Sequence, residues 1–341
     1  MHNLVEEPEI RDMLHGMARA LMGSPGSRTV LRVQARTAWL WLAVVGAVLG
    51  PSPTVAAEAI QLKPVAQGIY VYTGPHTDAS DSNLGAVGNV AIVVGEQSVA
   101  LIDSGGSLEF GLQLRAALEE ITDLPVSHVI NTHVHPDHLL GNGAFAGPTV
   151  EFVGHRRLGA ALAARAEFYL EAGTRNVGPK FAGTKAIGPT LEVADSIHIN
   201  LGGRVLKVTA HATAHTDNDL TVYDRRTRTL FAGDLVFVER LPIVDGSLKG
   251  WLAVIDDLRA VPAVRVVPGH GPASVRWPSA LHAQERYLQA LLHDVRIEIA
   301  AGGTIENAIG WVASEERSKW VRFAEDHPRN VTASFTELEW E

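Results

Sequence analysis

The chain has 341 residues, of which 46% are hydrophobic, and a formal net charge of -9. This length and apolar content are sufficient for a sizeable globular core, whereas the acidic balance argues against a nucleic-acid partner, since phosphate contact needs a basic face. The chain has no cysteine. Disulfide bonds are therefore excluded, and any metal ion must be bound by histidine and carboxylate side chains.

Residues 1–57 have the layout of a secretory signal peptide. Basic residues precede an apolar run of about twelve residues, 38–49, and small residues come after it. The run is shorter than the ~20 residues that a membrane-spanning helix needs. We therefore expect cleavage after Ala57 and a periplasmic or secreted protein, with an uncleaved anchor as the alternative. Acidic residues near the N-terminus suit a signal peptide poorly, so Met22 is an alternative start of translation.

Beyond residue 58 the sequence predicts alternating strands and helices. Alternating apolar residues predict edge strands over 60–71, and the loop 73–88, rich in Gly, Asp, Ser and Asn, could cover a site. A β-α-β passage comes next, made of strands 89–94 and 99–102, a helix 108–121 and a strand 126–130. A strand 150–153, a helix 156–172 and a hairpin 196–209 come next, and from this hairpin on strand, site loop, strand and helix recur in a similar order. This order favours two packed β sheets with outer helices.

The segment 131–138, directly after a predicted buried strand, reads NTHVHPDH and holds four adjacent candidate ligands: His133, His135, Asp137 and His138. Residues two apart in an extended segment face the same side, so His133 and His135 can point together, whereas Pro136 breaks the extension and re-aims the aspartate and the last histidine. Imidazole and carboxylate groups this close are costly to bury unless a cation binds them. We therefore predict a metal site at the C-terminal end of this strand, where sites form in open α/β sheets.

This cluster resembles the HxHxDH signature of the metallo-β-lactamase fold superfamily. The resemblance implies an α/β fold, a four-layer αββα sandwich of two packed mixed β sheets with outer helices. It also implies three further ligands: His215 in a His-Thr dipeptide, Asp234 after the strand 229–232, and His270 in a glycine-flanked turn. It assigns His133, His135 and His215 to one ion, Asp137, His138 and His270 to the other, and Asp234 to both.

Three more residues are predicted to support the site or to line its pocket. Asp103 ends a buried strand in Asp-Ser-Gly and is expected to brace the metal loop. His211 is expected in a pocket wall or against a ligand, because His215 fills the ligand role. Trp251 is expected as an apolar pocket wall or as a core residue.

The resemblance implies an exported binuclear metal-dependent hydrolase with two Zn²⁺ ions, iron or manganese being alternatives. A metal-bridged hydroxide would attack an ester, thioester, lactone or amide-like carbonyl of a small-molecule substrate, with Asp137 as the catalytic residue. A mono-iron persulfide dioxygenase-like enzyme and a non-catalytic accessory protein are alternatives. A β-lactamase is a further alternative, which the absence of cysteine weakens.

Two segments, 238–252 and 329–335, together with the signal peptide, are similar to the quinoprotein relay system zinc metallohydrolases. This similarity implies a functional association with a periplasmic quinoprotein dehydrogenase system. Residues 58–278 are expected to form the metallo-β-lactamase fold domain. Residues 279–341 are expected to form a mostly helical extension that is packed on the same domain and is not a catalytic module.

Overall fold

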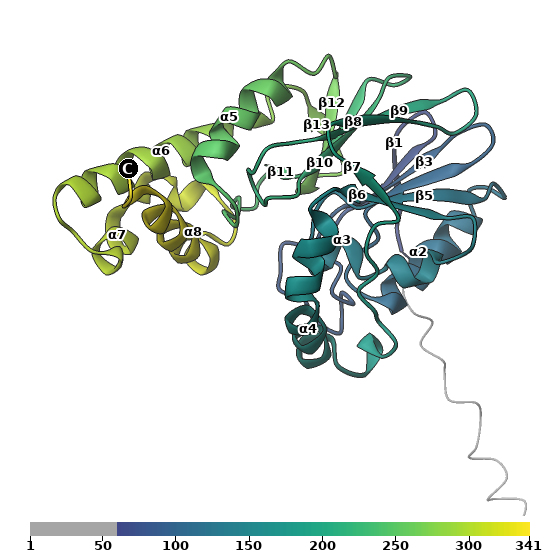
Figure 1. Cartoon of the computed structure of the whole chain (residues 1–341), viewed down its shortest axis with the longest axis horizontal. Coiled ribbons are helices and arrows are strands. Elements are labelled where there is room, and N and C mark those ends of the chain that lie inside the picture. The colour runs from purple at the N-terminus through teal and green to yellow at the C-terminus, as the bar shows by residue number, and fades with distance from the viewer. Residues whose placement is uncertain (1–59) are drawn as a thin grey trace, which may run out of the picture. The chain divides into compact units, whose positions relative to one another are not determined.

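The computed structural model describes residues 60–341, which form one compact unit (Figure 1). The predicted signal peptide lies outside the described residues. No helix in the described part of the chain is long and apolar enough to cross a membrane.

The first of two mixed sheets has seven strands. Their order across the sheet is the order of the sequence: β1 (Lys63–Ala66), β2 (Ile69–Tyr72), β3 (Val90–Val94), β4 (Val99–Ile102), β5 (Val126–Ile130), β6 (Glu151–His155) and β7 (Leu191–Val193). Strands β1 to β4 pair antiparallel, and β4 to β7 pair parallel. The parallel strands align their C-terminal ends at one edge, which positions the histidine segment after β5.

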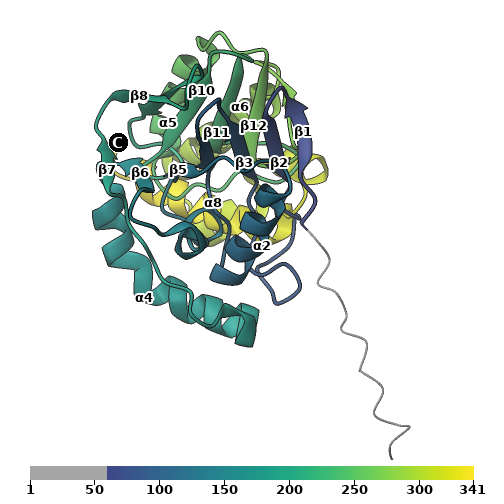
Figure 2. The ribbon, with the colours of Figure 1, turned by 90° about the vertical axis from the view of Figure 1, so that its right-hand side faces the viewer.

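The second sheet has six strands, in the order β13-β12-β11-β10-β9-β8 (Figure 2). They are β8 (Ser196–Asn200), β9 (Val205–Ala210), β10 (Leu220–Asp224), β11 (Thr229–Phe237), β12 (Arg265–His270) and β13 (Val275–Arg276). All neighbours pair antiparallel except β11 and β12, which are parallel.

Seven α-helices complete the described chain: α2 (Leu108–Glu119), α3 (Pro136–Leu139), α4 (Leu158–Val177), α5 (Leu248–Arg259), α6 (Leu281–Ala300), α7 (Ile305–Trp311) and α8 (Phe323–Leu338). Three 3-10 helices join them: η1 (Asn142–Phe145), η2 (Gly178–Phe181) and η3 (Ser314–Lys319). The helices predicted over 108–121 and 156–172 correspond to α2 and α4.

The layers result from the alternation of side chains along the strands. In β3, Ala91 and Val93 point to the second sheet, whereas Ile92 points to the other side and packs against Phe110 and Leu114 of α2. The second sheet meets the first with its own alternate residues, among them Val208, Val222 and Phe231. This arrangement confirms the predicted αββα sandwich.

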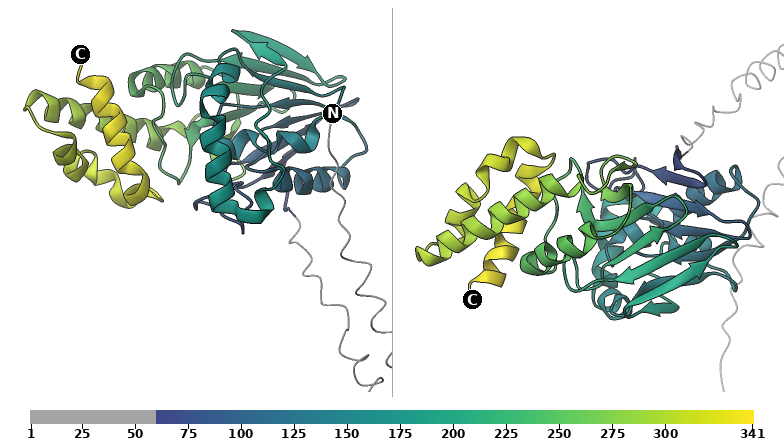
Figure 3. Two further views of the ribbon diagram at one scale, coloured as in Figure 1. Left: turned by 60° about the horizontal axis from the view of Figure 1, so that its bottom comes forward. Right: turned by 90° about the horizontal axis from the view of Figure 1, so that it is seen from above.

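One hydrophobic core joins the second sheet to helices α5, α6 and α8. Leu235 and Phe237 of β11 share one core with Trp251 of α5, Tyr287 of α6 and Phe335 of α8. Figures 1 and 3 show α6, α7 and α8 grouped beside α5. Helix α6 therefore packs on β11, the strand that carries Asp234, and α7 and α8 pack on α6.

Strand β11 differs from its prediction. The sequence predicts a strand over 229–232 that ends before Asp234, but β11 continues to Phe237. At Gly233, where φ is +50°, the pairing with β12 shifts register. A Cβ atom here would lie 2.6 Å from Cβ of Thr132, so this bulge requires glycine. Asp234 thus leaves the sheet at an irregularity inside the strand and not at the strand's end.

Candidate metal centre

The structure brings the seven predicted metal ligands together at one edge of the two sheets. They come from five segments: His133 and His135 after β5, Asp137 and His138 in α3, His215 between β9 and β10, Asp234 in β11, and His270 at the end of β12. The segment predicted as a loop includes the one-turn helix α3, which begins at Pro136. Proline suits the first helical position, since it has no N–H to leave unpaired.

The first cluster consists of His133, His135, His215 and Asp234. The Nδ1 atom of His135 lies 3.0 Å from Nε2 of His133 and 3.0 Å from Nε2 of His215. Oδ2 of Asp234 lies 3.7 Å from Nε2 of His133 and 3.4 Å from Nε2 of His215. Three ring nitrogens and one carboxylate oxygen therefore converge on one point.

The second cluster consists of Asp137, His138 and His270, and it adjoins Asp234. Oδ2 of Asp137 lies 3.4 Å from Nε2 of both His138 and His270. The two oxygens of Asp234 lie 3.2 Å from Nε2 of His138 and 3.3 Å from Nε2 of His270. Asp234 thus contacts both clusters, as the bridging position requires.

Backbone carbonyls set the tautomers of two histidines. Nδ1 of His215 lies 2.7 Å from the carbonyl oxygen of Ile243, and Nδ1 of His270 lies 2.9 Å from that of Val87. A carbonyl oxygen only accepts hydrogen bonds, so Nδ1 carries the hydrogen in both rings. The Nε2 atom of each ring therefore directs a free lone pair into its cluster.

Asp103 braces the metal loop from behind. Its oxygens accept from the backbone N–H and the hydroxyl of Thr132 and from Nδ1 of His138, each at 2.8 Å. Because the Thr132 hydroxyl donates to Asp103, its oxygen accepts from Nδ1 of His133 at 3.0 Å. Nε2 of His133 is therefore also free to bind a cation, Nε2 of His138 faces its own cluster, and Asp103 orients both rings.

Asp245 fixes the remaining histidine and was not predicted. Its Oδ2 accepts from Nε2 of His135 at 3.0 Å and from Arg165 of α4, and its Oδ1 accepts from Arg329 of α8 at 2.8 Å. Burial alone would raise the pKa of Asp245, but the hydrogen bonds from His135 and Arg165 outweigh burial and lower it. Asp245 therefore stays ionised and leaves Nδ1 of His135 free to bind a cation.

The donor set fits metal ions. Lone pairs of His133, His135 and His215 face one another at 3.0 Å with no hydrogen between them, so they repel unless a cation lies among them. Nε2 of His138 and Oδ1 of Asp234 are buried without any hydrogen-bond partner. Buried orphaned atoms of this kind need a ligand, and imidazole with carboxylate suits zinc and related ions.

The buried charges also favour a cation. Burial lowers the pKa of His215 to about 3, so this ring is neutral. Burial would lower the pKa of His138 as well, but the carboxylates of Asp234, Asp137 and Asp103 outweigh it and raise that pKa well above 6.5. The carboxylates thus attract positive charge, and a metal ion that binds here would displace the proton from His138.

Two glycines give the ligands room. A Cβ atom at position 269 would lie 1.9 Å from Oδ1 of Asp234, and one at position 88 would lie 2.8 Å from the ring of His138. Any side chain at either position would displace a ligand, so Gly269 and Gly88 are required by the close approach of the backbone.

The other two predicted support residues lie outside the pocket. Nε2 of His211 pairs with the Thr221 hydroxyl at 2.8 Å, and His211 does not line the pocket around the metal residues. Trp251 is fully buried, and its Nε1 donates to the carbonyl of Leu235. Its ring centroid lies 5.4 Å from that of His215. Of its two predicted roles, Trp251 therefore has the core role, and it supports His215 from behind.

A pocket of about 590 Å³ opens onto both clusters, and we call it the metal pocket. Its walls include His135, Asp137, His215, Asp234, His270, Val87, Arg165, Phe168, Tyr169, Arg240, Ile243, Asp245 and Arg329. The loop 73–88, predicted to cover the site, contributes Val87, and the segment 238–252 contributes Arg240, Ile243 and Asp245. Helix α8 also contributes, through Arg329, so the C-terminal extension forms part of the pocket.

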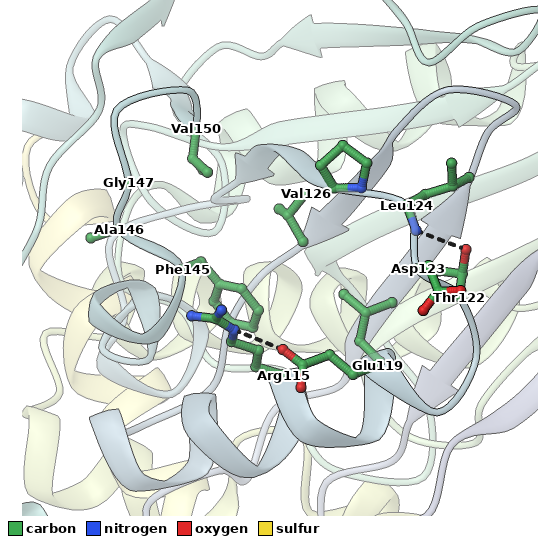
Figure 4. A pocket seen from close by; sticks show the side chains of 12 residues that line it. Arg115, Glu119, Thr122, Asp123, Leu124, Val126, Phe145, Ala146, Gly147 and Val150 are labelled. Carbon is green, nitrogen blue, oxygen red and sulfur yellow. Dashed lines mark hydrogen bonds and ion pairs between the residues drawn. The ribbon is translucent and has the colours of Figure 1, made fainter.

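A second cavity, of about 420 Å³, lies at the C-terminal end of α2 (Figure 4). Phe145, Val126 and Val150 line it, and an ion pair between Arg115 and Glu119 lies along its side. None of the clustered histidines lines this cavity, and it has no part in the metal centre.

Comparison with known proteins agrees with this geometry. Residues 84–270 match the family model of the Metallo-beta-lactamase superfamily. The chain belongs to this superfamily. The match includes all seven clustered residues, from the histidine segment to His270, and it ends before the C-terminal helices.

Two curated relatives of this superfamily member are hydrolases by name. The linear primary-alkylsulfatase of Pseudomonas sp. (strain ATCC 19151) is 26% identical over 53% of this chain. The human acyl-coenzyme A thioesterase MBLAC2 is 31% identical over 48% of this chain. The matched regions span 41% and 61% of the lengths of these relatives.

Solved structures share the fold. A metallo-beta-lactamase from Pontibacter korlensis is 25% identical, with a TM-score of 0.54 over 67% of this chain and 98% of that one. The stereoselective inverting sec-alkylsulfatase Pisa1 from Pseudomonas sp. is 16% identical, with a TM-score of 0.63 over 82% of this chain and 50% of that one.

Proposed function

We propose that this protein is a binuclear metal-dependent hydrolase of small molecules, with one zinc ion in each cluster. The observation that carries the proposal is the convergence of buried ring nitrogens and carboxylate oxygens on two points in the wall of an open pocket. The alkylsulfatase and thioesterase relatives support hydrolysis as the reaction. Bound metal ions would supply an activated water molecule and polarise the scissile bond.

Asp137 is the more exposed of the two candidate ligand carboxylates that line the metal pocket. Its side chain is 15% exposed, whereas that of Asp234 is 4% exposed. Oδ2 of Asp137 faces His138 and His270, so Oδ1 is available to accept a proton from the attacking water and to return it to the leaving group. Asp234 is enclosed and serves to hold the two clusters together.

The surrounding residues of the chain hold this arrangement rigid. Asp103 and Asp245 each orient ring nitrogens through hydrogen bonds to their outer sides. Arg165 and Arg329 hold Asp245 in turn, from α4 and α8. A ligand set fixed in this way loses little entropy when it binds a cation, and it presents the same geometry to each substrate.

We also propose that the protein is exported and acts beside a periplasmic quinoprotein dehydrogenase system. The signal-like residues 1–57 and the similarity of segments 238–252 and 329–335 to the quinoprotein relay system zinc metallohydrolases support this proposal. Expression of the tagged full chain, with fractionation and N-terminal sequencing, tests it. A protein that remains cytoplasmic with residues 1–57 attached would contradict the proposal.

Metal analysis of the purified protein, combined with hydrolysis assays, tests the proposed reaction. We expect about two zinc ions per chain and turnover of at least one member of a panel of lactones, aryl esters, thioesters, alkyl sulfates and β-lactams, abolished by a chelator and restored by zinc. One iron ion per chain, with sulfur-dependent oxygen uptake and no hydrolysis, would replace the hydrolase with a persulfide dioxygenase. Metal binding with neither reaction would indicate an accessory protein.

A further inference from the structure

Arg240 differs from the other arginines of the metal pocket. Arg165 and Arg329 both pair with Asp245. Among residues 60–341, Arg240 has no ion pair, and its Nε atom is buried without a hydrogen-bond partner. A buried guanidinium nitrogen without an acceptor is costly, so its partner is expected from outside the protein.

The nearest protein group cannot be that partner. Nη1 of Arg240 lies 3.3 Å from Nδ1 of His270, but this ring nitrogen already carries the hydrogen that it donates to the carbonyl of Val87. Two donors face each other here, so the contact is not a hydrogen bond. Arg240 therefore presents an uncompensated positive charge to the pocket, next to a metal ligand.

The backbone holds Arg240 firmly in this position. Leu241 N–H donates to the carbonyl of Val321 at 3.1 Å, and Val321 N–H donates to that of Glu239 at 2.8 Å. Glu239 has a φ of +68°, a conformation that non-glycine residues rarely adopt. The segment before α8 thus fixes the arginine, and a strained residue precedes it, as is common at ligand-binding positions.

A small apolar cavity of about 160 Å³ adjoins the metal pocket beneath α4, and we call it the α4 cavity. Five residues line both spaces: Val87, Pro136, Asp137, Tyr169 and Ala172. The remaining walls of the α4 cavity are mostly small or apolar, including Leu140, Val177 and Phe181. Arg240 lines the metal pocket and not the α4 cavity, so the two features would bind different parts of one ligand.

Gly173 allows Phe181 to close the far side of the α4 cavity. A Cβ atom at position 173 would lie 2.2 Å from the Phe181 ring, so the ring rests directly on the helix backbone. The volume of the α4 cavity, about 160 Å³, is close to that of a cavity that holds a benzene-sized group. The α4 cavity therefore suits a short alkyl chain or a single ring, and not a long lipid chain.

We infer that the substrate carries a short apolar group on one side of the scissile bond and an anionic group on the other. The apolar group occupies the α4 cavity beside Asp137, and the anionic group pairs with Arg240. This inference rests on the proposed hydrolase function and specifies its substrate class. Asp137 belongs to both spaces, so it would adjoin the point where the two groups join.

Matched aryl esters test the inference with the zinc-loaded protein. The substrate 4-(butanoyloxy)benzoate is an anion, and its methyl ester is neutral with the same scissile bond. Addition of water to the carbonyl and loss of the phenolate give butanoate and 4-hydroxybenzoate, with release of a proton. We expect kcat/KM to be about 10- to 100-fold higher for the anion, as a charge-assisted hydrogen bond supplies. Equal values for both esters would overturn the Arg240 assignment.

Variants of Arg240 locate the anion preference. In Arg240→Ala the preference should disappear, whereas Arg240→Lys should retain part of it. Arg175→Ala removes an arginine of α4 whose side chain is 60% exposed, and it serves as the control that keeps the preference. A preference that survives Arg240→Ala would overturn the assignment. Zinc content and thermal melting of each variant show whether the metal centre and fold are intact.

Chain length tests the α4 cavity. Activity on acetyl, butanoyl, octanoyl and dodecanoyl esters of 4-hydroxybenzoate should peak at butanoyl and fall for the two longest chains. Ala172→Leu fills the cavity and should lower kcat/KM about 10-fold for butanoyl and less for acetyl, without changing the anion preference. The control is Ala163→Leu, at an exposed position of the same helix. The same chain-length profile in Ala172→Leu and the wild type would overturn the cavity assignment.

A binding measurement separates this inference from the reaction itself. The ether 4-butoxybenzoate has the same two groups but no scissile ester, so calorimetric titration reports binding alone. We expect the wild-type protein to bind it and both Arg240→Ala and Ala172→Leu to weaken binding about 10-fold. If no ester is hydrolysed but this pattern holds, the proposed reaction is wrong and the ligand class stands. If esters are hydrolysed but neither variant changes binding or selectivity, the ligand class is wrong.

Discussion

Two buried groups of charges in this protein differ in how completely the chain neutralises them. In the first, Arg204 is 2% exposed and donates to both oxygens of Asp224, at 3.2 and 2.8 Å, and to the carbonyl of Val94 at 2.8 Å. In the second, the metal centre, the inner nitrogens of the histidines and Oδ1 of Asp234 find no donor.

The difference distinguishes a structural charge cluster from a binding site. Buried charged or polar side chains occur in both places, so burial alone does not identify function. At Arg204 every strong donor has an acceptor, and the cluster ties the first sheet to the second. At the metal centre the outer side of each ring is satisfied and the inner side is not. An external cation completes the second cluster, whereas the first needs nothing.

Removal of Asp137 should produce the largest effect on activity. Asp137→Ala removes one metal ligand and the more exposed of the two cluster carboxylates, so kcat/KM should fall by about 10²- to 10⁴-fold, with the fold intact. Steady-state kinetics and circular dichroism check both parts. Asp81→Ala, in an exposed part of the covering loop, is the control. A loss below about tenfold would show that Asp137 is not needed for the reaction.

Removal of Arg204 should produce the largest effect on stability. Arg204→Ala leaves Asp224 buried without its partner, and this should cost about 3–5 kcal/mol of unfolding free energy. Urea denaturation measures the loss. The surface pair of Arg226 and Glu96 is exposed, so Arg226→Ala should cost less than about 1 kcal/mol. Similar losses in the two variants would contradict the distinction between paired and exposed charges.

A local signal predicted four of the proposed metal ligands, because the four residues of the HxHxDH segment lie within six positions. The resemblance to the metallo-β-lactamase fold superfamily implied the other three. The alternation of apolar residues also predicted the two sheets and helix α2. The exact position of Asp234 escaped prediction, because a bulge at Gly233 depends on contact with Thr132, which is distant in sequence.

Residues that act across long sequence separations could not be predicted. Asp245 contacts His135 over 110 positions, and Arg329 contacts Asp245 over 84. In the sequence, each resembles an ordinary solvated charge. The one nearby residue that hints at a constrained position is the glycine after Asp245, because a Cβ atom there would lie 2.6 Å from the carbonyl of Ala214 in the His215 loop. This close approach is visible only in the folded chain.

Loss of Asp245 should weaken metal binding without abolishing it. Asp245→Ala removes the acceptor that orients His135, and outer partners of this kind are worth about 10- to 100-fold in metal affinity. Competition with a chromogenic chelator measures the zinc affinity. Asp245→Asn retains an acceptor and should be intermediate, and Asp256→Ala, at a side chain that is 76% exposed, is the control. Unchanged affinity in Asp245→Ala would mean that the ligands hold their positions without it.

A histidine in the C-terminal helices should produce a smaller effect that depends on pH. Nε2 of His327 donates to the carbonyl of Val312, and Nδ1 accepts from the Tyr287 hydroxyl, each at 3.0 Å. Both ring nitrogens of His327 have hydrogen-bond partners within the protein. In this respect His327 is like Arg204, whose donors are all paired, and unlike the proposed metal ligands. Burial lowers the pKa of His327 to about 4.

The unfolded chain therefore takes up a proton at this position first, as the pH falls below about 6.5, and the native state loses stability between pH 6.5 and pH 4. Between pH 7 and pH 5.5 the loss from this residue should be on the order of 1 kcal/mol. Urea denaturation at the two pH values should show a smaller difference in His327→Gln than in the wild type, whereas His293→Gln, at an exposed position of α6, should behave as the wild type does. If the unfolding free energy changes with pH by the same amount in His327→Gln and in the wild type, His327 does not resist protonation. The hydrogen bonds of His327 would then not distinguish it from the histidines of the metal centre.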